Sequence, residues 1–257
     1  MTRLREAFEH ETRAALVAYL TFGDPDPAAS IDVVESACRA GADVIELGVP
    51  FSDPSADGPS IQRAMERALA AGATLSGALD AVAELRRRGI ATPIVLFGYY
   101  NPVFVMGVDA FAARASASGV DAVLTVDLPI DELGELAAPL ARAGVDVIPL
   151  VAPTSTPDRI ARVAAFAPPF VYYISLVGVT GATGARNSID PARLAAIREA
   201  AHAPVAVGFG IRTADDARAF VAAGADGVVV GSALVERVAS GGVATLVAQL
   251  AAGLGRA

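Results

Sequence analysis

A short phrase that recurs four times along the chain places the strongest constraint on its fold. Each copy reads small residue, Gly, small residue, Asp, and then runs into an apolar segment. This is the pattern of a helix end, a glycine cap, a turn and a strand. The copies occupy residues 40–48, 118–126, 143–151 and 223–231. Their strand halves are apolar throughout and do not alternate, which indicates parallel strands covered on both faces.

Four further apolar segments, without the phrase, complete a regular alternation of strands and helices. They lie at residues 15–21, 93–98, 170–175 and 204–208. Helical patterns are expected at residues 28–39, 60–88, 110–117, 131–143, 157–166, 191–201 and 214–223, and after residue 231. Eight such units in 257 residues predict an α/β protein: a (βα)8 TIM barrel, one domain over residues 1–257, with a short N-terminal helix. A doubly wound open sheet is the alternative.

The charge and the hydropathy pattern limit the partners and the location of the protein. A formal net charge of −8 argues against binding to nucleic acid and to anionic membrane surfaces. The first ten residues are charged and carry no apolar signal core, so we expect a cytoplasmic protein. Two long uncharged stretches, residues 89–108 and 163–185, contain prolines and glycines. Buried strands with loops explain them better than membrane spans do.

Two residue types that could carry chemistry are scarce. All 20 basic residues are arginine, so this chain cannot form a lysine Schiff base or hold pyridoxal phosphate covalently. The only histidines are His10 and His202, both near expected helix ends. We therefore expect neither a metal site nor a Ser-His-Asp triad.

Glu46 stands out because it lies in an apolar run that otherwise predicts a buried strand. Burial of a charged carboxylate is costly without a partner or a purpose. The loop that follows carries two more acids, Asp53 and Asp57. A buried acid at the end of a barrel strand, followed by an acidic loop, is typical of a catalytic acid/base site. Glu46 could instead be a core acid paired with an arginine, and Asp57 a helix cap.

Glycine-rich turns follow three late strands, at residues 178–181, 208–211 and 231–234. Backbone amides at such turns bind a phosphate dianion well, and barrels commonly place a phosphate at the loops after strands 7 and 8. A single glycine turn says little, but three turns at the last three strand ends predict a phosphate-binding site.

Several of these segments together resemble the tryptophan synthase α subunit family. The matching segments, in the same order and around the same strands, are residues 21–25, 46–59, 99–102, 127–129, 152–154, 172–175, 178–181 and 208–211. The resemblance implies a (βα)8 barrel and retro-aldol cleavage of indole-3-glycerol phosphate to indole and glyceraldehyde 3-phosphate. It also implies no cofactor in this chain, with pyridoxal phosphate only in a β subunit that receives the indole.

The resemblance also implies roles for individual residues. Glu46 matches the catalytic acid/base, and Asp57 matches the carboxylate that accepts the indole N–H. The positions matching the substrate pocket are Tyr19, Phe97, Asp127, Tyr172 and Thr180, with Phe22 and Phe97 bulkier than is usual. Those matching the phosphate site are Gly181, Gly210, Gly231 and Ser232, and those matching the β-subunit interface of an α2β2 hetero-tetramer are Pro50, Asp53, Pro54, Asn101 and Pro102.

Three rival functions are considered beside this one. The chain could be a stand-alone lyase that releases free indole, which turnover without a β subunit would indicate. It could be another phosphate-binding barrel, such as an isomerase or an aldolase, although the lysine-dependent aldolases are excluded by composition. It could be a non-catalytic regulatory partner, which the presence of both Glu46 and Asp57 argues against.

Overall fold

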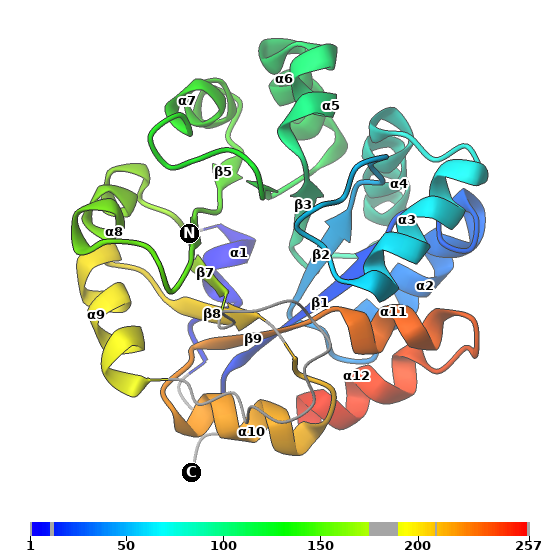
Figure 1. Cartoon of the computed structure of the whole chain (residues 1–257). Coiled ribbons are helices and arrows are strands. Elements are labelled where there is room, and N and C mark those ends of the chain that lie inside the picture. Colours follow the sequence, from blue (N-terminus) through cyan, green and yellow to red (C-terminus); the bar gives the residue numbers. More distant parts are fainter. Residues whose placement is uncertain (1, 11–12, 175–189, 209, 256–257) are drawn as a thin grey trace.

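The computed structural model describes residues 2–10, 13–174, 190–208 and 210–255. Its strands form a central parallel sheet that curls into a barrel, and helices surround it on the outside (Figure 1). The strands are β1 (Ala15–Thr21), β2 (Val44–Gly48), β3 (Ile94–Gly98), β4 (Ala122–Thr125), β5 (Asp146–Val147), β6 (Leu150–Val151), β7 (Val171–Ile174), β8 (Val205–Gly208) and β9 (Gly227–Val230). The predicted α/β barrel is confirmed, and its extent over the whole of residues 1–257 stays a prediction.

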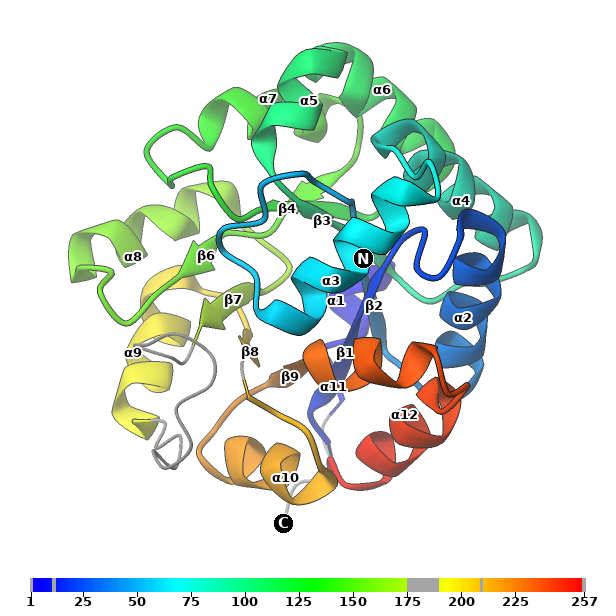
Figure 2. The same ribbon diagram turned by 45° about the vertical axis from the view of Figure 1, so that its right-hand side comes forward.

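The helices follow the strands in the alternation that the sequence predicts, with α5 (Tyr100–Met106) as an additional helix that it does not predict. They are α1 (Arg3–Glu6), α2 (Pro27–Arg39), α3 (Pro59–Ala70), α4 (Leu75–Arg87), α5 (Tyr100–Met106), α6 (Val108–Ser118), α7 (Gly134–Arg142), α8 (Pro157–Val163), α9 (Pro191–Ala201), α10 (Ala214–Ala222), α11 (Ser232–Val238) and α12 (Val243–Ala252). A short 3₁₀ helix, Ala164–Phe166, follows α8. Figure 2 shows the same ring of helices from another side.

One expected helix is two helices in the structure. The pattern over residues 60–88 predicts a single helix, but α3 ends at Ala70 and α4 begins at Leu75. Gly72 adopts a φ of 83° in the link, which glycine tolerates and a helix does not. Thr74 then caps α4, its side-chain oxygen accepting a hydrogen bond from Gly77 N at 3.1 Å. The single-helix prediction is wrong because the Gly and Thr signals were outweighed by the apolar periodicity.

The fifth predicted strand is split, and the split closes the barrel. Its first half, β5, pairs with β4, and its second half, β6, pairs with β7. Between them, Ile148 N donates to Val123 O at 2.9 Å, and Pro149 O accepts from Tyr172 N at 3.0 Å. Proline has no N–H of its own, so the segment changes partners at this point without losing a ladder donor.

The recurrent aspartates have a structural role at the start of the strands. Three of the four accept a hydrogen bond from a backbone N–H near the start of a neighbouring strand, and each also binds an arginine. The backbone donors are Leu16 to Asp43 at 2.8 Å, Ile94 to Asp121 at 2.8 Å and Val205 to Asp226 at 2.9 Å. The arginines are Arg13, Arg86 and Arg198. Charge-assisted bonds of this kind fix the register between adjacent strands at their amino ends.

The apolar core has an outer and an inner part. Outward-facing residues of the strands pack against the helices, while inward-facing ones fill the barrel. Helix α1 and the residues after it cover the barrel at the amino ends of the strands. There Phe8 stacks on Phe170 with ring centroids 4.7 Å apart. The cavity described below lies at the other end of the barrel, at the carboxyl ends of the strands.

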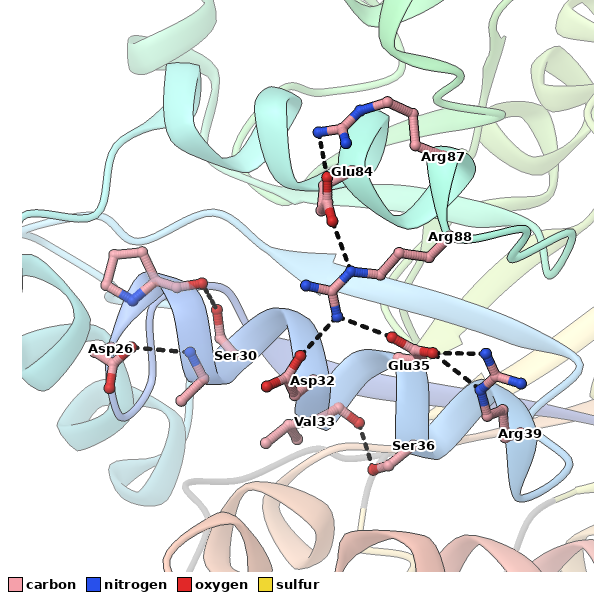
Figure 3. A network of polar contacts seen from close by, with 12 residues as sticks. Asp26, Ser30, Asp32, Val33, Glu35, Ser36, Arg39, Glu84, Arg87 and Arg88 are labelled. Atoms are coloured by element: carbon pink, nitrogen blue, oxygen red, sulfur yellow. Dashed lines mark hydrogen bonds and ion pairs between the residues drawn. The ribbon is translucent and has the colours of Figure 1, made fainter.

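Helices α2 and α4 are joined on the outside by a cluster of charges, which we call the α2–α4 clasp (Figure 3). Arg88 lies at its centre. It donates to Asp32 at 2.6 Å, to Glu35 at 2.9 Å and to Glu84 at 2.7 Å. Arg39 extends the cluster by donating to Glu35 at 2.6 Å.

No single helix in the described part of the chain is long and apolar enough to cross a membrane. Helices α3 and α4 would be long and apolar enough only if taken together, and they are bent by 93° where they meet.

Candidate active site

Glu46 lies inside the barrel, at the carboxyl end of β2. In this strand Ile45 and Leu47 pack outward against the helices, so the alternation of a strand turns Glu46 inward. Its side chain is fully buried, and within the described residues neither carboxylate oxygen has a hydrogen-bond partner. Burial raises the pKa of Glu46 from 4.5 to about 8. The alternative of an arginine-paired core acid is therefore wrong for the described structure.

Asp57 lies on the loop between β2 and α3 and lines the same cavity as Glu46. This cavity has a volume of about 390 Å³. Burial raises the pKa of Asp57 to about 6, and a hydrogen bond from Tyr99 opposes the rise. The cap of α3 is Gly58, with no side-chain cap bond. Asp57 is thus not the helix cap that we considered as an alternative.

Tyr99 holds Asp57, a role that sequence reasoning missed. Its hydroxyl donates to Asp57 Oδ2 at 2.7 Å and accepts from Ala56 N at 3.0 Å. Its ring stacks on Phe51 with centroids 4.8 Å apart. Tyr99 belongs to one of the matching segments, but its contact with Asp57 spans 42 positions and no local pattern predicts it.

Three aromatic rings form the wall around Glu46. The register of β1 and β2 places Tyr19 directly beside Glu46. The ring of Phe97 meets that of Tyr19 edge-on, with centroids 5.2 Å apart, and its centroid lies 6.4 Å from that of Tyr172. All three line the cavity, and the resemblance assigns these positions to the substrate pocket. Burial raises the pKa values of both tyrosines well above their usual range, so their hydroxyls stay neutral.

Two strand-end glycines make room for these tyrosines. A Cβ on Gly48 would lie 2.2 Å from the Tyr19 hydroxyl oxygen, and one on Gly208 would lie 2.0 Å from that of Tyr172. Real Cβ atoms do not approach so closely, so a side chain at either position would force the neighbouring tyrosine to shift.

Another part of the cavity lining contains residues predicted to bind phosphate. Gly210, Gly231 and Ser232 all belong to it. Gly210 adopts a φ of 74°, a conformation that favours glycine. Thr180 and Gly181, the other predicted members of the pocket and phosphate site, lie outside the described residues. Ser60, Arg212 and Glu236 also line the cavity and were not predicted.

Asp127 braces a neighbouring element and does not line the main cavity. Its carboxylate accepts from Tyr100 N at 2.8 Å, at the start of α5. It borders a second hollow of about 210 Å³ that adjoins the main one at Val126 and Leu150. Phe22 is buried and packs toward Gly77, outside the cavity lining, so of the two bulky phenylalanines only Phe97 shapes the pocket.

The five residues predicted to meet a partner differ in exposure. Asp53 and Asn101 are exposed, Pro54 and Pro102 are half-buried, and Pro50 is buried. Beside them on α5, Phe104 and Val105 are 66% and 77% exposed. Two neighbouring apolar side chains so open to water are typical of an interaction surface. Sequence reasoning missed them, although their position two and three residues after Pro102 could have indicated them.

The described residues contain no group of three or more side chains suited to hold a metal ion. The cavity offers Glu46 and Asp57, three aromatic rings, the glycines at positions 210 and 231, and the charged pair of Arg212 and Glu236. Such an arrangement suits proton transfer to and from a flat aromatic substrate that carries an anionic tail.

Comparison with known proteins gives a consistent result. A model of the tryptophan synthase alpha chain family matches residues 6–252. A tryptophan synthase alpha chain of Geobacter sulfurreducens is 54% identical over 239 residues, which cover 92% of this chain and 90% of the relative. One from Methylococcus capsulatus is 50% identical over 243 residues, covering 93% of this chain and 91% of the relative.

Solved structures agree with the sequence relatives. A chain in the structure of Mycobacterium tuberculosis tryptophan synthase superposes with a TM-score of 0.90 at 38% identity, covering 100% of this chain and 99% of that one. The tryptophan synthase subunit alpha from Legionella pneumophila gives a TM-score of 0.85 at 33% identity and 98% coverage of both chains.

Proposed function

The chain belongs to the tryptophan synthase alpha chain family, and from that premise we propose how its residues perform the family's reaction. The protein is the alpha subunit of tryptophan synthase, a carbon–carbon lyase. It cleaves indole-3-glycerol phosphate to indole and glyceraldehyde 3-phosphate.

The observation that carries the assignment of residues is the pairing of Glu46 and Asp57 in one cavity. Burial raises the pKa values of both, to about 8 and about 6. Near pH 7 the first acid holds its proton while the second has released it. One group can then donate a proton and the other can stabilise a positive charge.

Glu46 gives its proton to C3 of the indole ring. This step makes an indolenine whose positively charged nitrogen accepts the electrons of the bond that breaks. The Glu46 carboxylate then takes the proton from the adjacent glycerol hydroxyl, the C–C bond breaks, and an aldehyde and indole form. The proton given and the proton taken balance, so Glu46 ends in its initial state.

Asp57 accepts the indole N–H and stabilises the positive charge that develops on the nitrogen. Tyr99 fixes the carboxylate for this contact and keeps it ionised, because its hydrogen bond lowers the pKa of Asp57. A fixed anion beside a developing cation acts without reorganisation at the moment of reaction.

The walls of the cavity orient the substrate. Tyr19, Phe97 and Tyr172 hold the indole plane between apolar surfaces. Asp127 braces the start of α5 beside them. The phosphate lies at the end lined by Gly210, Gly231 and Ser232. Family resemblance adds Thr180 and Gly181 to the same end of the site.

The partner is a tryptophan synthase β subunit, in an α2β2 hetero-tetramer whose β subunit alone holds pyridoxal phosphate. The contact surface combines the predicted positions Asp53, Pro54, Asn101 and Pro102 with the exposed side chains Phe104 and Val105. Pro50 is buried in the isolated chain, directly before the loop that carries Asp53 and Pro54. We place the complex in the cytoplasm, where amino-acid biosynthesis is carried out.

The decisive experiment measures turnover of indole-3-glycerol phosphate by the pure chain, with and without a β subunit. We expect weak turnover alone and a rise of at least about tenfold with the partner, equal to roughly 1.4 kcal/mol of barrier. Rapid turnover that no β subunit changes would favour the stand-alone lyase. Replacing Phe104 and Val105 by serine should reduce the rise without changing the turnover of the isolated chain.

A further inference from the structure

Three side chains in the cavity lining form a hydrogen-bonded bridge near the residues proposed to bind phosphate. Glu236, on α11, accepts from Ser60 Oγ at 2.7 Å through one carboxylate oxygen and from Arg212 through the other. All three residues line the same cavity as Gly210 and Gly231. The bridge therefore joins the start of α3, the loop after β8 and helix α11 beside the glycines where the phosphate is proposed to lie.

The backbone fixes Arg212 in this position. Its N–H donates to Asp216 Oδ2 at 3.0 Å, and the next N–H, that of Thr213, donates to the same oxygen at 2.8 Å. The bond from Thr213 belongs to the capping box of α10, and the bond from Arg212 extends it by one residue. The start of a capped helix is rigid, so the Arg212 side chain leaves the backbone in a defined direction.

The guanidinium of Arg212 keeps unused hydrogen-bonding capacity. Its side chain is 56% exposed, and within the described residues its only side-chain hydrogen bond goes from Nη2 to Glu236. Arginine has five N–H donors in a planar fork, a geometry that suits phosphate oxygens. The Nε and Nη1 donors are thus open to a ligand that enters this end of the cavity.

The two charges of the bridge act on a phosphate in opposite ways. Hydrogen bonds from Arg212 and then Ser60 lower the pKa of Glu236, and the bond to Glu236 raises the pKa of Arg212. Both groups are therefore charged near neutral pH. A phosphate dianion near Gly210 is attracted by the guanidinium and repelled by the carboxylate.

We propose that Arg212 is a specificity-determining residue that binds the substrate phosphate, and that Glu236 aims Arg212 while opposing the anion. The proposal rests on the proposed function, because it needs a phosphate near Gly210 and Gly231. The pair selects a phosphate monoester dianion over a neutral analogue. It also sets an affinity that is lower than the arginine alone would give.

A purely structural clasp is the alternative, because the bridge begins three residues after Asp57. In that case removal of either partner loosens the Asp57 loop, and both substitutions lower kcat in the same direction. Phosphate recognition gives the opposite result: loss of Arg212 weakens binding and loss of the Glu236 charge strengthens it. The two readings are therefore separable.

The test measures kcat and KM for indole-3-glycerol phosphate with the full chain and saturating β subunit. It also measures the Kd of indole-3-propanol phosphate and of indole-3-propanol, which lacks the phosphate. For Arg212→Met we expect KM and the Kd of the phosphate ester to rise by about three- to fivefold, as suits a half-exposed charge pair. The Kd of the alcohol should not change, Arg212→Lys should restore part of the loss, and Glu236→Gln should lower KM.

Arg218→Met is the matched control, because it removes the same charge from α10 at an ion pair with Asp215 that lies outside the cavity lining. It should leave every constant unchanged. An unchanged KM in Arg212→Met, or an equal fall of kcat in Arg212→Met and Glu236→Gln, would overturn the proposal while wild-type cleavage leaves the proposed function intact. A wild-type complex that does not cleave the substrate would remove the proposed function and this proposal with it.

Discussion

Glutamates in two regions of the molecule have opposite surroundings, and the difference explains their different properties. In the α2–α4 clasp, Glu35 and Glu84 lie at the surface beside Arg88, whose hydrogen bonds lower the pKa values of both (Figure 3). Inside the barrel, Glu46 has no such partner among the described residues, and burial raises its pKa to about 8. Near neutral pH a glutamate is therefore ionised in the clasp and protonated in the barrel.

The surroundings of a carboxyl group decide whether it keeps its proton near neutral pH. A surface carboxylate is solvated or paired with a cation, so its ionised form is stable near neutral pH. In the cavity, Tyr19, Phe97 and Tyr172 surround the fully buried Glu46, and burial favours its protonated form near neutral pH. The reactive state of Glu46 thus results from the absence of the contacts that stabilise the clasp.

The largest expected effect comes from Glu46→Gln, which keeps the shape of the side chain and removes its proton transfer. We expect turnover to fall by roughly 10²–10⁴-fold, with substrate affinity nearly intact. Rapid-quench turnover and equilibrium binding should be measured separately. Glu84→Gln in the clasp is the matched control and should keep full activity. Wild-type turnover in Glu46→Gln would end the assignment of this residue.

A smaller but still large effect is expected for Asp57→Asn. The amide oxygen can meet the indole N–H, but it cannot offset a positive charge on the nitrogen. Turnover should fall by about 10²-fold, with a modest change in KM. If Asp57→Asn retains full activity and Asp57→Ala unfolds, the carboxylate has a structural role only. Circular dichroism of both variants makes this distinction.

Tyr99→Phe should shift the pH dependence of kcat/KM more than its maximum. Asp57 must be ionised and Glu46 protonated, so the wild-type profile should be a bell with limbs near about 6 and about 8. Loss of the Tyr99 hydrogen bond raises the pKa of Asp57 further, so activity should be lost at higher pH as the solution is acidified. Tyr100→Phe, at the neighbouring position, should leave both limbs in place. An unmoved acid limb in Tyr99→Phe would show that this bond does not control Asp57.

The smallest effects concern stability, and they should differ in sign between the two regions. Because burial raises the pKa of Glu46 from 4.5 to about 8, the folded state retains a proton that the unfolded chain releases in this range. The free energy of unfolding should therefore fall between these pH values, and Glu46→Gln should flatten the fall. In the clasp, the lowered pKa of Glu84 stabilises the fold above its ordinary value of 4.5, and this contribution is lost as pH falls through the folded pKa.

Glu84→Gln should accordingly lower the stability slightly at neutral pH, and the difference from wild type should vanish in acid and in high salt. Urea unfolding at several pH values measures both variants. A pH dependence of the same sign in Glu46→Gln and Glu84→Gln would contradict the comparison.

Local patterns predicted most of the fold. The first strand was placed at residues 15–21, and β1 occupies the same range. The glycine caps and recurrent aspartates marked the starts of β2, β4 and β9 because such signals act within a few residues. The break between α3 and α4 was missed because a periodic apolar pattern can continue across a short link. The split of the fifth strand was missed because it depends on barrel closure.

For the candidate site, the sequence by itself determined which residues are available: an acid in an apolar strand, an acidic loop, three aromatic residues and late glycines. These are properties of short segments and of residue type. The tertiary structure alone decided that Glu46 has no hydrogen-bond partner among the described residues, that Tyr99 holds Asp57, and that Glu236 binds both Arg212 and Ser60. The physical reason is that these contacts join residues far apart in the chain, which become neighbours only when the parallel strands close the barrel and gather their carboxyl ends at one face.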